Sequence, residues 1–462
     1  MALNKKSGSP TQLYLARRYL VLMLAVVPLF AALGGFVRQQ LQLPTWPAPM
    51  AEPIPRGRIL ARDGTVLAEG AASYRRYPQG QLASHLIGFS GAVQPDGRYG
   101  LEGLEYTYDQ RLQAGEPVVT TLDPTLQAAA ERHLRDAIIR HEADNGAVVM
   151  IETGTGHVLA AASYPSFDPN MRETRTQAAL TNRAFLQQYE PGSVMKPFVV
   201  AALLESGRLR PDEVIPAEMA LRVGSKTFRD VAQHDSHLAV PDILRYSSNV
   251  AMIHLSDRFT PEEQHAWLRH FGFGQEMGLN SIFTRTGQLN HWQHWVPQDK
   301  ASITIGQSVS TTALQLAAAY SIFANDGLYI PPQLVVGEKL SLPKRALSPE
   351  TALAVRSMLV YTVEESSLRN SKIPFVSVAG KTGTADIFDQ ASGRYIDGDY
   401  TLGFAGIFPA ENPRITMVVY LQKPRNGTMS TLVAAPLFRA IGSEVVAHWG
   451  LPLNALTYVG QP

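Results

Sequence analysis

The chain has 462 residues, a length that predicts two or three structural modules rather than one ordinary core. Its 41 basic and 40 acidic residues give a formal net charge of +1, so no excess of positive charge indicates nucleic acid as a partner. The absence of cysteine excludes disulfides, zinc–thiolate sites and thiol catalysis. Only 10 lysines stand against 31 arginines, so a lysine at a chemically suggestive position is informative.

The N-terminal region predicts one membrane-spanning helix. From Tyr19 to Val37 the chain carries no charge, and these 19 residues would extend about 28 Å as an α-helix, enough to cross a bilayer core. Pro28 predicts a kink within this helix. A cleaved signal peptide is the alternative, although the run is longer than the usual signal core and no small-x-small cleavage site follows it.

The charges that flank this helix predict its orientation. Basic residues precede it at Lys5, Lys6, Arg17 and Arg18, whereas only Arg38 follows closely. The positive-inside rule therefore places residues 1–18 in the cytoplasm as a tail and residues 19–37 in the cytoplasmic (inner) membrane as a single pass. Everything after the helix is then extracytoplasmic or periplasmic.

Residues 38–117 are predicted to form a stalk and a small membrane-proximal module. The stalk is the segment LQLPTWPAPMAEPIP, whose five prolines in 15 residues are typical of an extended spacer. Residues 56–117 combine short strand-like runs with turn signals such as PDGRYG and show no long amphipathic helix.

Residues 118–462 are predicted to form the main domain. Asp123 and Pro124 are typical of a helix start, and GAVVMIETGTGHVLAAASYP predicts two strands joined by a glycine turn. Helical patterns dominate from 190 to 325. Strand patterns return in VAGKTGTA, GFAGIFP and ITMVVYL, followed by a final amphipathic helix in AAPLFRAIGSEVVAHW. The expected fold class is α+β, an antiparallel sheet flanked by helices with an additional helical subdomain.

The segment EPGSVMKPFVV places Ser193 and Lys196 three residues apart at the predicted start of an apolar helix. A serine there is commonly only a cap, but residues at this spacing share one helical face, so the amine could reach the hydroxyl. Lysine can lose its proton when it is desolvated and then act as a base, which arginine cannot do. Ser341 and Lys344 share the spacing, but Pro343 between them predicts a loop.

Two further motifs follow along the chain. The segment RYSSNVAM contains the only Ser-x-Asn of the sequence, at Ser247 and Asn249, and is expected to form a turn between helices. The segment VAGKTGTADI, with Lys381 to Thr384 at its centre, predicts an edge strand that could bind a carboxylate and pair with an extended peptide. Taken alone, each has an ordinary structural interpretation as a polar turn or a strand.

The order Ser-x-x-Lys, Ser-x-Asn, Lys-Thr-Gly resembles the motif set of penicillin-binding proteins and class A β-lactamases. The segments YPSFDPN, NRAF, EPGSVMKP, IGQSVSTTALQLAAAYSIFANDG and GKTGTA, with GRILARDGTVLA and YGLEGLEYTYD, look like class B penicillin-binding proteins. This resemblance covers roughly residues 56–445 and is strongest, through EPGSVMKP, to the division-type transpeptidases. The membrane-proximal module is much shorter than the usual pedestal of that family.

The resemblance implies a penicillin-binding transpeptidase fold and a peptidoglycan D,D-transpeptidase that cross-links stem peptides through a serine acyl-enzyme, is targeted by β-lactams and serves septal cell-wall synthesis. It implies catalytic roles for Ser193, Lys196, Ser247, Asn249 and Lys381, and substrate binding by Thr382, Gly383 and Thr384. The backbone N–H groups of Ser193 and Thr384 would form the oxyanion hole. No cofactor or metal is implied. The implied partners are a multi-span lipid II polymerase and other divisome or elongasome membrane proteins.

Three alternatives remain open. A D,D-carboxypeptidase would differ only in using water as the acceptor. A membrane-anchored β-lactamase is suggested by EMGLN, residues 276–280, which imitates the segment that supplies a deacylating base in class A enzymes. A catalytically silent β-lactam sensor or scaffold is disfavoured because no motif member is lost. The histidine pairs His234/His237 and His291/His294 have spacings that a metal could use, but neither has an obvious third ligand.

Overall fold

The computed structural model describes residues 10–40, 56–279, 284–338, 341–389 and 393–451, which belong to two compact units, Met1–Ile54 and Pro55–Pro462. The first unit contains α1 (Pro10–Gln40), which continues through Pro28 and beyond the predicted end at Val37. Its 18-residue window Arg17–Gly34 has a mean hydropathy of 1.6 and is long and apolar enough to cross a membrane. The stalk at 41–55 and the first nine residues of the tail lie outside the described residues.

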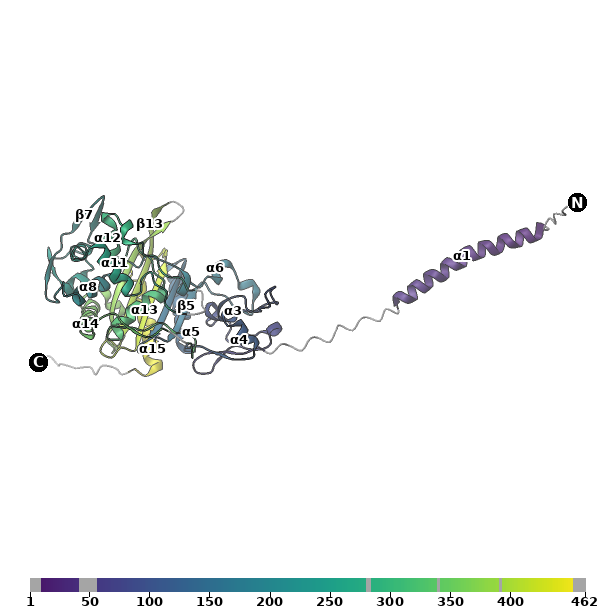
Figure 1. The fold of residues 1–462 in the computed structure, drawn as a ribbon, viewed down its shortest axis with the longest axis horizontal. Helices are drawn as coiled ribbons and strands as arrows, with labels where there is room; N and C mark the ends of the chain where they lie inside the picture. The colour runs from purple at the N-terminus through teal and green to yellow at the C-terminus, as the bar shows by residue number, and fades with distance from the viewer. Residues whose placement is uncertain (1–9, 41–55, 280–283, 339–340, 390–392, 452–462) are drawn as a thin grey trace. The chain divides into compact units, whose positions relative to one another are not determined.

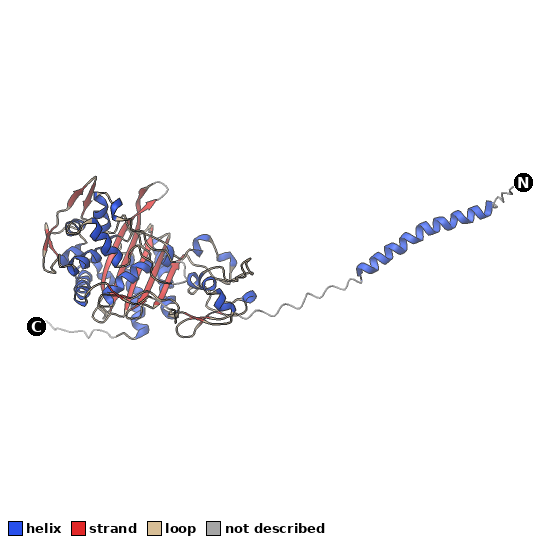
Figure 2. Ribbon diagram, in the orientation of Figure 1, coloured by secondary structure: helices blue, strands red, loops and turns tan. Residues whose placement is uncertain are grey.

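The second unit is built around a five-stranded antiparallel sheet with the order β12-β13-β14-β4-β5 (Figure 2). Its strands are β4 (Asn145–Glu152), β5 (Val158–Tyr164), β12 (Ala379–Asp389), β13 (Arg394–Phe408) and β14 (Ile415–Gln422). The predicted hairpin is β4 and β5, and the predicted Lys-Thr-Gly strand is β12 at one edge of the sheet. Both predictions are confirmed.

The two faces of this sheet are covered by different helices. Alternate residues of β4 point to opposite sides, so Val149 packs into one hydrophobic cluster and Val148 into the other. The Val148 side is covered by α5 (Pro124–His141) and α15 (Ala434–Trp449), and the Val149 side by α13 (Ala313–Ala324) (Figure 1). Residues of α8 (Lys196–Glu205) belong to the same hydrophobic cluster as α13. The predicted cap of α5 is confirmed, because the Asp123 carboxylate accepts from two N–H groups of its first turn.

Between β5 and β12 the chain forms the helical subdomain. Its remaining α-helices are α6 (Gln177–Leu180), α7 (Arg183–Leu186), α9 (Val240–Tyr246), α10 (Asn249–Ser256), α11 (Pro261–His270), α12 (Pro297–Thr304) and α14 (Pro349–Glu365). Short 3₁₀ turns are η2 (Arg172–Thr174), η3 (Gly192–Met195), η4 (Trp292–His294) and η5 (Ser367–Ser371).

Small two-stranded sheets interrupt these helices. They are β6 (Val214–Pro216) with β9 (His237–Ala239), β7 (Ala220–Val223) with β8 (Lys226–Arg229), and β10 (Leu328–Tyr329) with β11 (Lys344–Arg345). The sequence does not predict them, because strands of two to four residues are too short to establish a period of two. Lys344 lies in β11 and is exposed, which confirms that the SLPK segment is not a helix.

The membrane-proximal module contains short elements only, as predicted. They are β1 (Ile59–Leu60), β2 (Val66–Ala68), η1 (Ala72–Tyr74), α2 (Ser84–Ile87), α3 (Gly103–Thr107), α4 (Asp109–Gln113) and β3 (Val118–Val119). Buried Arg56 joins them through ion pairs with Glu105 at 2.8 Å and Asp109 at 2.9 Å. β3 pairs in parallel with β1, so a strand of the module lies just beyond the predicted boundary at 117. The domain limits themselves stay a prediction.

Candidate active site

Ser193 lies in the 3₁₀ turn η3, which leads directly into α8 at Lys196. In a 3₁₀ turn the side chains of residues i and i+3 project from the same side, so this turn favours the same side for Ser193 and Lys196. Ser193 does not cap the helix: the N-cap of η3 is Pro191, and no side-chain cap hydrogen bond forms. In the described part of the chain no hydrogen bond engages the Ser193 hydroxyl, which leaves it available to react.

Two glycines allow the η3 turn to lie against the edge strand β12. Gly192 has φ +64°, and a Cβ there would lie 2.5 Å from the carbonyl oxygen of Thr384. A Cβ on Gly383 would lie 2.3 Å from the carbonyl oxygen of Pro191. Only glycine permits both approaches without displacement of backbone. The strand and the turn that carries Ser193 therefore share one tight backbone interface.

Lys196 is completely buried and points toward the Ser-x-Asn motif. Its Nζ donates to the Ser247 carbonyl oxygen, to Ser247 Oγ at 3.1 Å and to Asn249 Oδ1 at 2.8 Å. Burial, and then the positive charge of Lys381, hold the pKa of Lys196 well below its usual 10.5. The predicted proximity to the Ser193 hydroxyl does not take the form of a hydrogen bond among the described residues.

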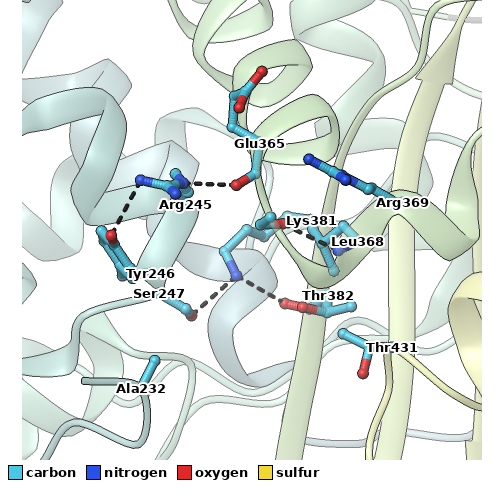
Figure 3. Close-up of a pocket in the computed structure, with 11 residues that line it drawn as sticks. Ala232, Arg245, Tyr246, Ser247, Glu365, Leu368, Arg369, Lys381, Thr382 and Thr431 are labelled. Carbon is cyan, nitrogen blue, oxygen red and sulfur yellow. Dashed lines mark hydrogen bonds between the residues drawn. The ribbon is translucent and has the colours of Figure 1, made fainter. Parts of the chain in front are cut away.

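The second buried amine belongs to Lys381 on β12. Its Nζ donates to Ser247 Oγ at 2.9 Å and to the Thr382 carbonyl oxygen at 3.4 Å (Figure 3). Burial lowers the pKa of Lys381 to about 7. The Ser247 hydroxyl thus lies between two amines that repel each other when both are charged. The arrangement favours one neutral amine, which can accept a proton, next to one charged amine.

Ser247 lies in the turn between α9 and α10, as the sequence predicted. It ends α9 with φ +58°, a left-handed conformation that is costly for a residue other than glycine. Ser248 then caps α10, because its hydroxyl accepts from the Ala251 N–H at 3.0 Å. This turn directs both the hydroxyl of Ser247 and the amide of Asn249 toward Lys196.

The carboxylate of Asp230 holds this turn, and the sequence analysis missed it. Its Oδ1 accepts from the N–H groups of Asn249 at 2.5 Å and Val250 at 3.1 Å. Its Oδ2 accepts from the Ser248 hydroxyl at 2.5 Å and pairs with His234 Nε2 at 2.9 Å. The Asp230 and His234 side chains are 1% and 0% exposed. Asp230 also affects Lys196. Its negative charge raises the pKa of that amine and so opposes the two larger effects, burial and the charge of Lys381, which lower it.

The only sequence signal near Asp230 is the histidine pair His234/His237 that follows it in RDVAQHDSH, whose spacing a metal could use. The structure instead pairs His234 with Asp230, whereas the His237 ring contacts the Ser236 hydroxyl. Among the residues that the structure describes, no group of three or more His, Cys, Asp or Glu side chains could hold a metal ion.

The three residues after Lys381 occupy different environments. Thr382 lines a pocket of about 550 Å³ together with Ser247 and Lys381. The Thr384 hydroxyl shares a hydrogen bond of 2.8 Å with Ser430 Oγ, which also donates to the Gly383 carbonyl oxygen at 2.6 Å. Ser430 is a second residue that the sequence analysis missed, since nothing in GTMSTLV marks it. Its buried hydroxyl fixes the orientation of the Thr384 side chain.

The carboxylate that suggested a β-lactamase lies apart from these contacts. Glu276 is exposed, and no hydrogen bond or ion pair in the described ranges joins it to Ser193, Lys196 or Lys381. Asn280, at the end of the same segment, lies outside the described residues.

The chain matches known proteins along most of its length. Residues 146–443 match the family described as penicillin binding protein transpeptidase domain. The probable peptidoglycan D,D-transpeptidase PbpC of Pseudomonas aeruginosa is 31% identical over 435 residues, 87% of this chain and 76% of that protein. The peptidoglycan D,D-transpeptidase FtsI of Escherichia coli is 30% identical over 417 residues, 83% of this chain and 69% of that protein.

Solved structures of penicillin binding proteins are also similar to this chain. Penicillin binding protein 3 of Mycobacterium tuberculosis, in its apo form, has a TM-score of 0.80 and 31% identity, covering 87% of this chain and 98% of that one. Its complex with ampicillin has the same TM-score and identity and covers 89% of this chain and 98% of that one. The three motifs meet at the hydroxyl of Ser247. Together with these similarities, this arrangement shows that the chain belongs to the penicillin-binding protein transpeptidases and fits their class B.

Proposed function

We propose that the protein is a serine-type peptidoglycan D,D-transpeptidase that cross-links stem peptides and is acylated by β-lactams. The single observation that carries the proposal is the meeting of two buried amines, Lys196 and Lys381, at the hydroxyl of Ser247. Ser193, whose hydroxyl is free to react, lies in the η3 turn that packs against the edge strand β12. A buried amine with a lowered pKa is a competent general base, and a helix-like turn beside a strand edge provides N–H groups for an oxyanion.

In the proposed acylation, Ser193 Oγ attacks the carbonyl carbon between the two terminal D-alanines while neutral Lys196 accepts the hydroxyl proton. The C–N bond breaks, and the proton taken up by Lys196 passes through the Ser247 hydroxyl to the amine of the departing D-alanine, so that Lys196 becomes neutral again and Ser247 keeps its proton. Asn249 holds the substrate amide. The N–H groups of Ser193 and Thr384 bind the oxyanion of the tetrahedral intermediate.

Lys381, Thr382 and Thr384 are proposed to bind the terminal carboxylate of the stem peptide. A charged amine and hydroxyl donors suit a carboxylate, and the position of β12 at the edge of the sheet suits pairing with an extended peptide. Gly383 contributes by its lack of a side chain, which keeps the strand against the η3 turn.

The membrane context is part of the proposal. The apolar helix α1 supports a single pass with the catalytic unit on the extracytoplasmic side. The resemblance to division-type transpeptidases supports septal cell-wall synthesis with a multi-span lipid II polymerase and other divisome membrane proteins. A fluorescent fusion in living cells should gather at the septum; a signal confined to the lateral wall would contradict this assignment and favour elongasome partners.

The reaction is tested with a thioester analogue of the stem-peptide terminus and the full-length protein in detergent. With D-alanine as acceptor, the protein should form the transfer product in addition to the hydrolysis product. Hydrolysis that no acceptor diverts would identify a carboxypeptidase. Rapid turnover of free penicillin that is lost in Glu276→Gln would identify a β-lactamase, and no acylation by either compound would identify a silent protein.

Asp230→Asn is expected to slow acylation by penicillin about tenfold, because a neutral amide makes weaker hydrogen bonds to the Ser-x-Asn turn than a carboxylate does. The acid limb of the pH–rate profile should also move to lower pH. The reason is that the charge of Asp230 raises the pKa of Lys196, so its removal lowers the pH at which the amine becomes neutral. Stopped-flow acylation over a pH series measures both effects.

Asp235→Asn is the matched control for this prediction, since Asp235 is exposed and five positions further along the chain. It should leave the rate and the profile unchanged. A profile for Asp230→Asn that has only a lower amplitude, with its acid limb unmoved, would show that Asp230 does not act on Lys196.

Gly383→Ala is expected to slow acylation roughly 10²-fold, because the methyl group would displace the η3 turn from β12 and misplace the nucleophile. Gly403→Ala is the matched control. Gly403 pairs with Gly383 across the two strands, and a Cβ there meets nothing closer than 3.4 Å. Acylation rates and thermal unfolding are measured for both variants. Equal acylation rates in Gly383→Ala and Gly403→Ala would contradict the proposal that the close packing of β12 against the η3 turn positions Ser193.

A further inference from the structure

The pocket of about 550 Å³ opens on the side of the cluster that carries Ser247, Lys381 and Thr382 (Figure 3). Its far walls come from two other elements. Arg245 and Tyr246 belong to the last turn of α9, and Leu368 and Arg369 belong to η5. In the view of Figure 3 the amine of Lys381 lies between the pocket's two arginines and Ser247. The pocket is therefore continuous with the reacting groups but extends beyond them.

Arg245 is a fixed cation. Its Nε donates to the Glu365 carbonyl oxygen at 2.8 Å, its Nη1 donates to Asp242 Oδ1 at 3.2 Å, and its guanidinium lies 4.5 Å from the ring centroid of Tyr246. These contacts hold the guanidinium in one orientation at the rim of the pocket. The Nη2 group takes no part in the hydrogen bonds found among the described residues, so one donor edge remains for a ligand.

Arg369 is the second cation, and it is only weakly held. Within the described ranges its guanidinium makes one hydrogen bond, from Nε to the Glu364 carbonyl oxygen at 3.4 Å, and takes part in no ion pair. The lining thus contains the side-chain cations Arg245, Arg369 and Lys381 and the single carboxylate of Glu365. Asp242, outside the lining, pairs with Arg245, so among the described residues the positive charge without a carboxylate partner belongs to Arg369 and Lys381. This excess of positive charge favours an anionic ligand.

We propose that this pocket is the acceptor subsite of the transpeptidase, and that Arg369, together with Arg245, binds a carboxylate on the same carbon as the attacking amine. The inference rests on the proposed function. If Lys381 and Thr382 hold the terminal carboxylate, the departing D-alanine leaves on the pocket side, with its amine and carboxylate on one carbon. The incoming amine must approach along the path by which that amine left. An acceptor with the same pair of groups enters this pocket with its carboxylate facing the cations that line it, Lys381 and, further from the reacting carbon, Arg245 and Arg369.

The transfer step needs no further reactant. The lone pair of the acceptor amine attacks the carbonyl carbon of the Ser193 ester, a C–N bond forms, and the bond from that carbon to Ser193 Oγ breaks. One amine proton passes through Lys196 to the serine oxygen, which restores the hydroxyl. A carboxylate held by Arg369 orients the amine for this attack without taking part in it. Arg369 is therefore a specificity-determining residue.

This arrangement discriminates between two kinds of acceptor. An amine on a carbon that bears a carboxylate can form charge-assisted bonds with an arginine fork, whereas a side-chain amine on an unsubstituted methylene cannot. Binding sites built to bond a charged group discriminate strongly against analogues that lack it, because their own polar groups are then left unpaired.

The test uses the thioester donor with the full-length protein and compares two acceptors, D-alanine and D-alaninamide, which differ in the carboxylate. For Arg369→Gln, transfer to D-alanine should fall about tenfold relative to hydrolysis, the loss expected for one charge-assisted bond. Transfer to D-alaninamide should change less than twofold. Arg369→Lys should recover part of the transfer to D-alanine, since it keeps the charge but loses the planar fork.

Arg439→Gln is the matched control, an exposed arginine on α15 that should leave both transfers unchanged. Labelling of Ser193 by fluorescent penicillin verifies that each variant is folded. Equal transfer by the unaltered protein and Arg369→Gln, or an equal fall with both acceptors, would overturn the acceptor subsite alone. Failure of the unaltered protein to form an acyl-enzyme would instead overturn the proposed function.

Discussion

Ser193→Ala is expected to abolish covalent labelling by fluorescent penicillin. The hydroxyl of Ser193 lies at the η3 turn against β12, and alanine removes the only atom there that the proposed mechanism uses to form an ester. Intact-mass measurement after incubation with penicillin should show one adduct on the unaltered protein and none on the variant. The adduct should map to the peptide that contains Ser193.

Ser206→Ala is a suitable control for this experiment. Ser206 ends α8, and its hydroxyl donates to the Leu203 carbonyl oxygen at 3.2 Å, so its loss should leave labelling intact. An adduct that persists in Ser193→Ala at the normal rate would refute the assignment of the nucleophile.

Lys196→Arg is expected to slow acylation by about 10²–10⁴-fold, the usual contribution of a positioned general base. Arginine retains a positive charge and hydrogen-bond donors but cannot release its proton in a protein, so it cannot accept the proton of Ser193. The effect therefore separates a base from a structural cation. Acylation by penicillin under pre-steady-state conditions measures it.

The pH dependence gives a second measure of the same role. In the unaltered protein acylation should increase as the pH rises through the lowered pKa of Lys196, because the neutral amine is the active form. That limb should be absent in Lys196→Arg. Lys300→Arg serves as the control, since Lys300 bonds the Phe259 carbonyl oxygen and pairs with Asp257. A variant at Lys196 that keeps both the rate and the limb would exclude this lysine as the base.

The sheet and the motifs could be predicted from the sequence because their signals are local. Runs such as ITMVVYL are buried on both faces and contain residues that favour strands, and the Asp123–Pro124 pair marks the start of α5 directly. The three motifs could be assigned to one site because their order resembles a known family. Spacing alone could not have placed Lys196 next to Ser247, since the contact depends on the packing of α8 against α10.

The residues that could not be predicted contact the site from distant parts of the sequence. Asp230 lies in a loop 17 positions before Ser247, and only the folded chain brings its carboxylate beneath the Ser-x-Asn turn. Ser430 likewise reaches Thr384 from the segment that precedes α15. Neither residue belongs to a periodic pattern or a motif. The N-terminus of α11 has the opposite character: the Thr260 hydroxyl accepts from the Glu263 N–H and the Glu263 side chain bonds back to Thr260, a capping box that depends on two residues only three positions apart.

The hydroxyl of Ser247 has a consequence for folding. It receives hydrogen bonds from amines that lie 51 residues before it and 134 residues after it. Contacts of such long sequence separation require the closure of large loops, so they are expected to form late and together. A partly folded chain would then contain all three motifs without a working site. Reactivity toward penicillin therefore reports completion of the entire catalytic unit, and an activity-based probe could follow its refolding.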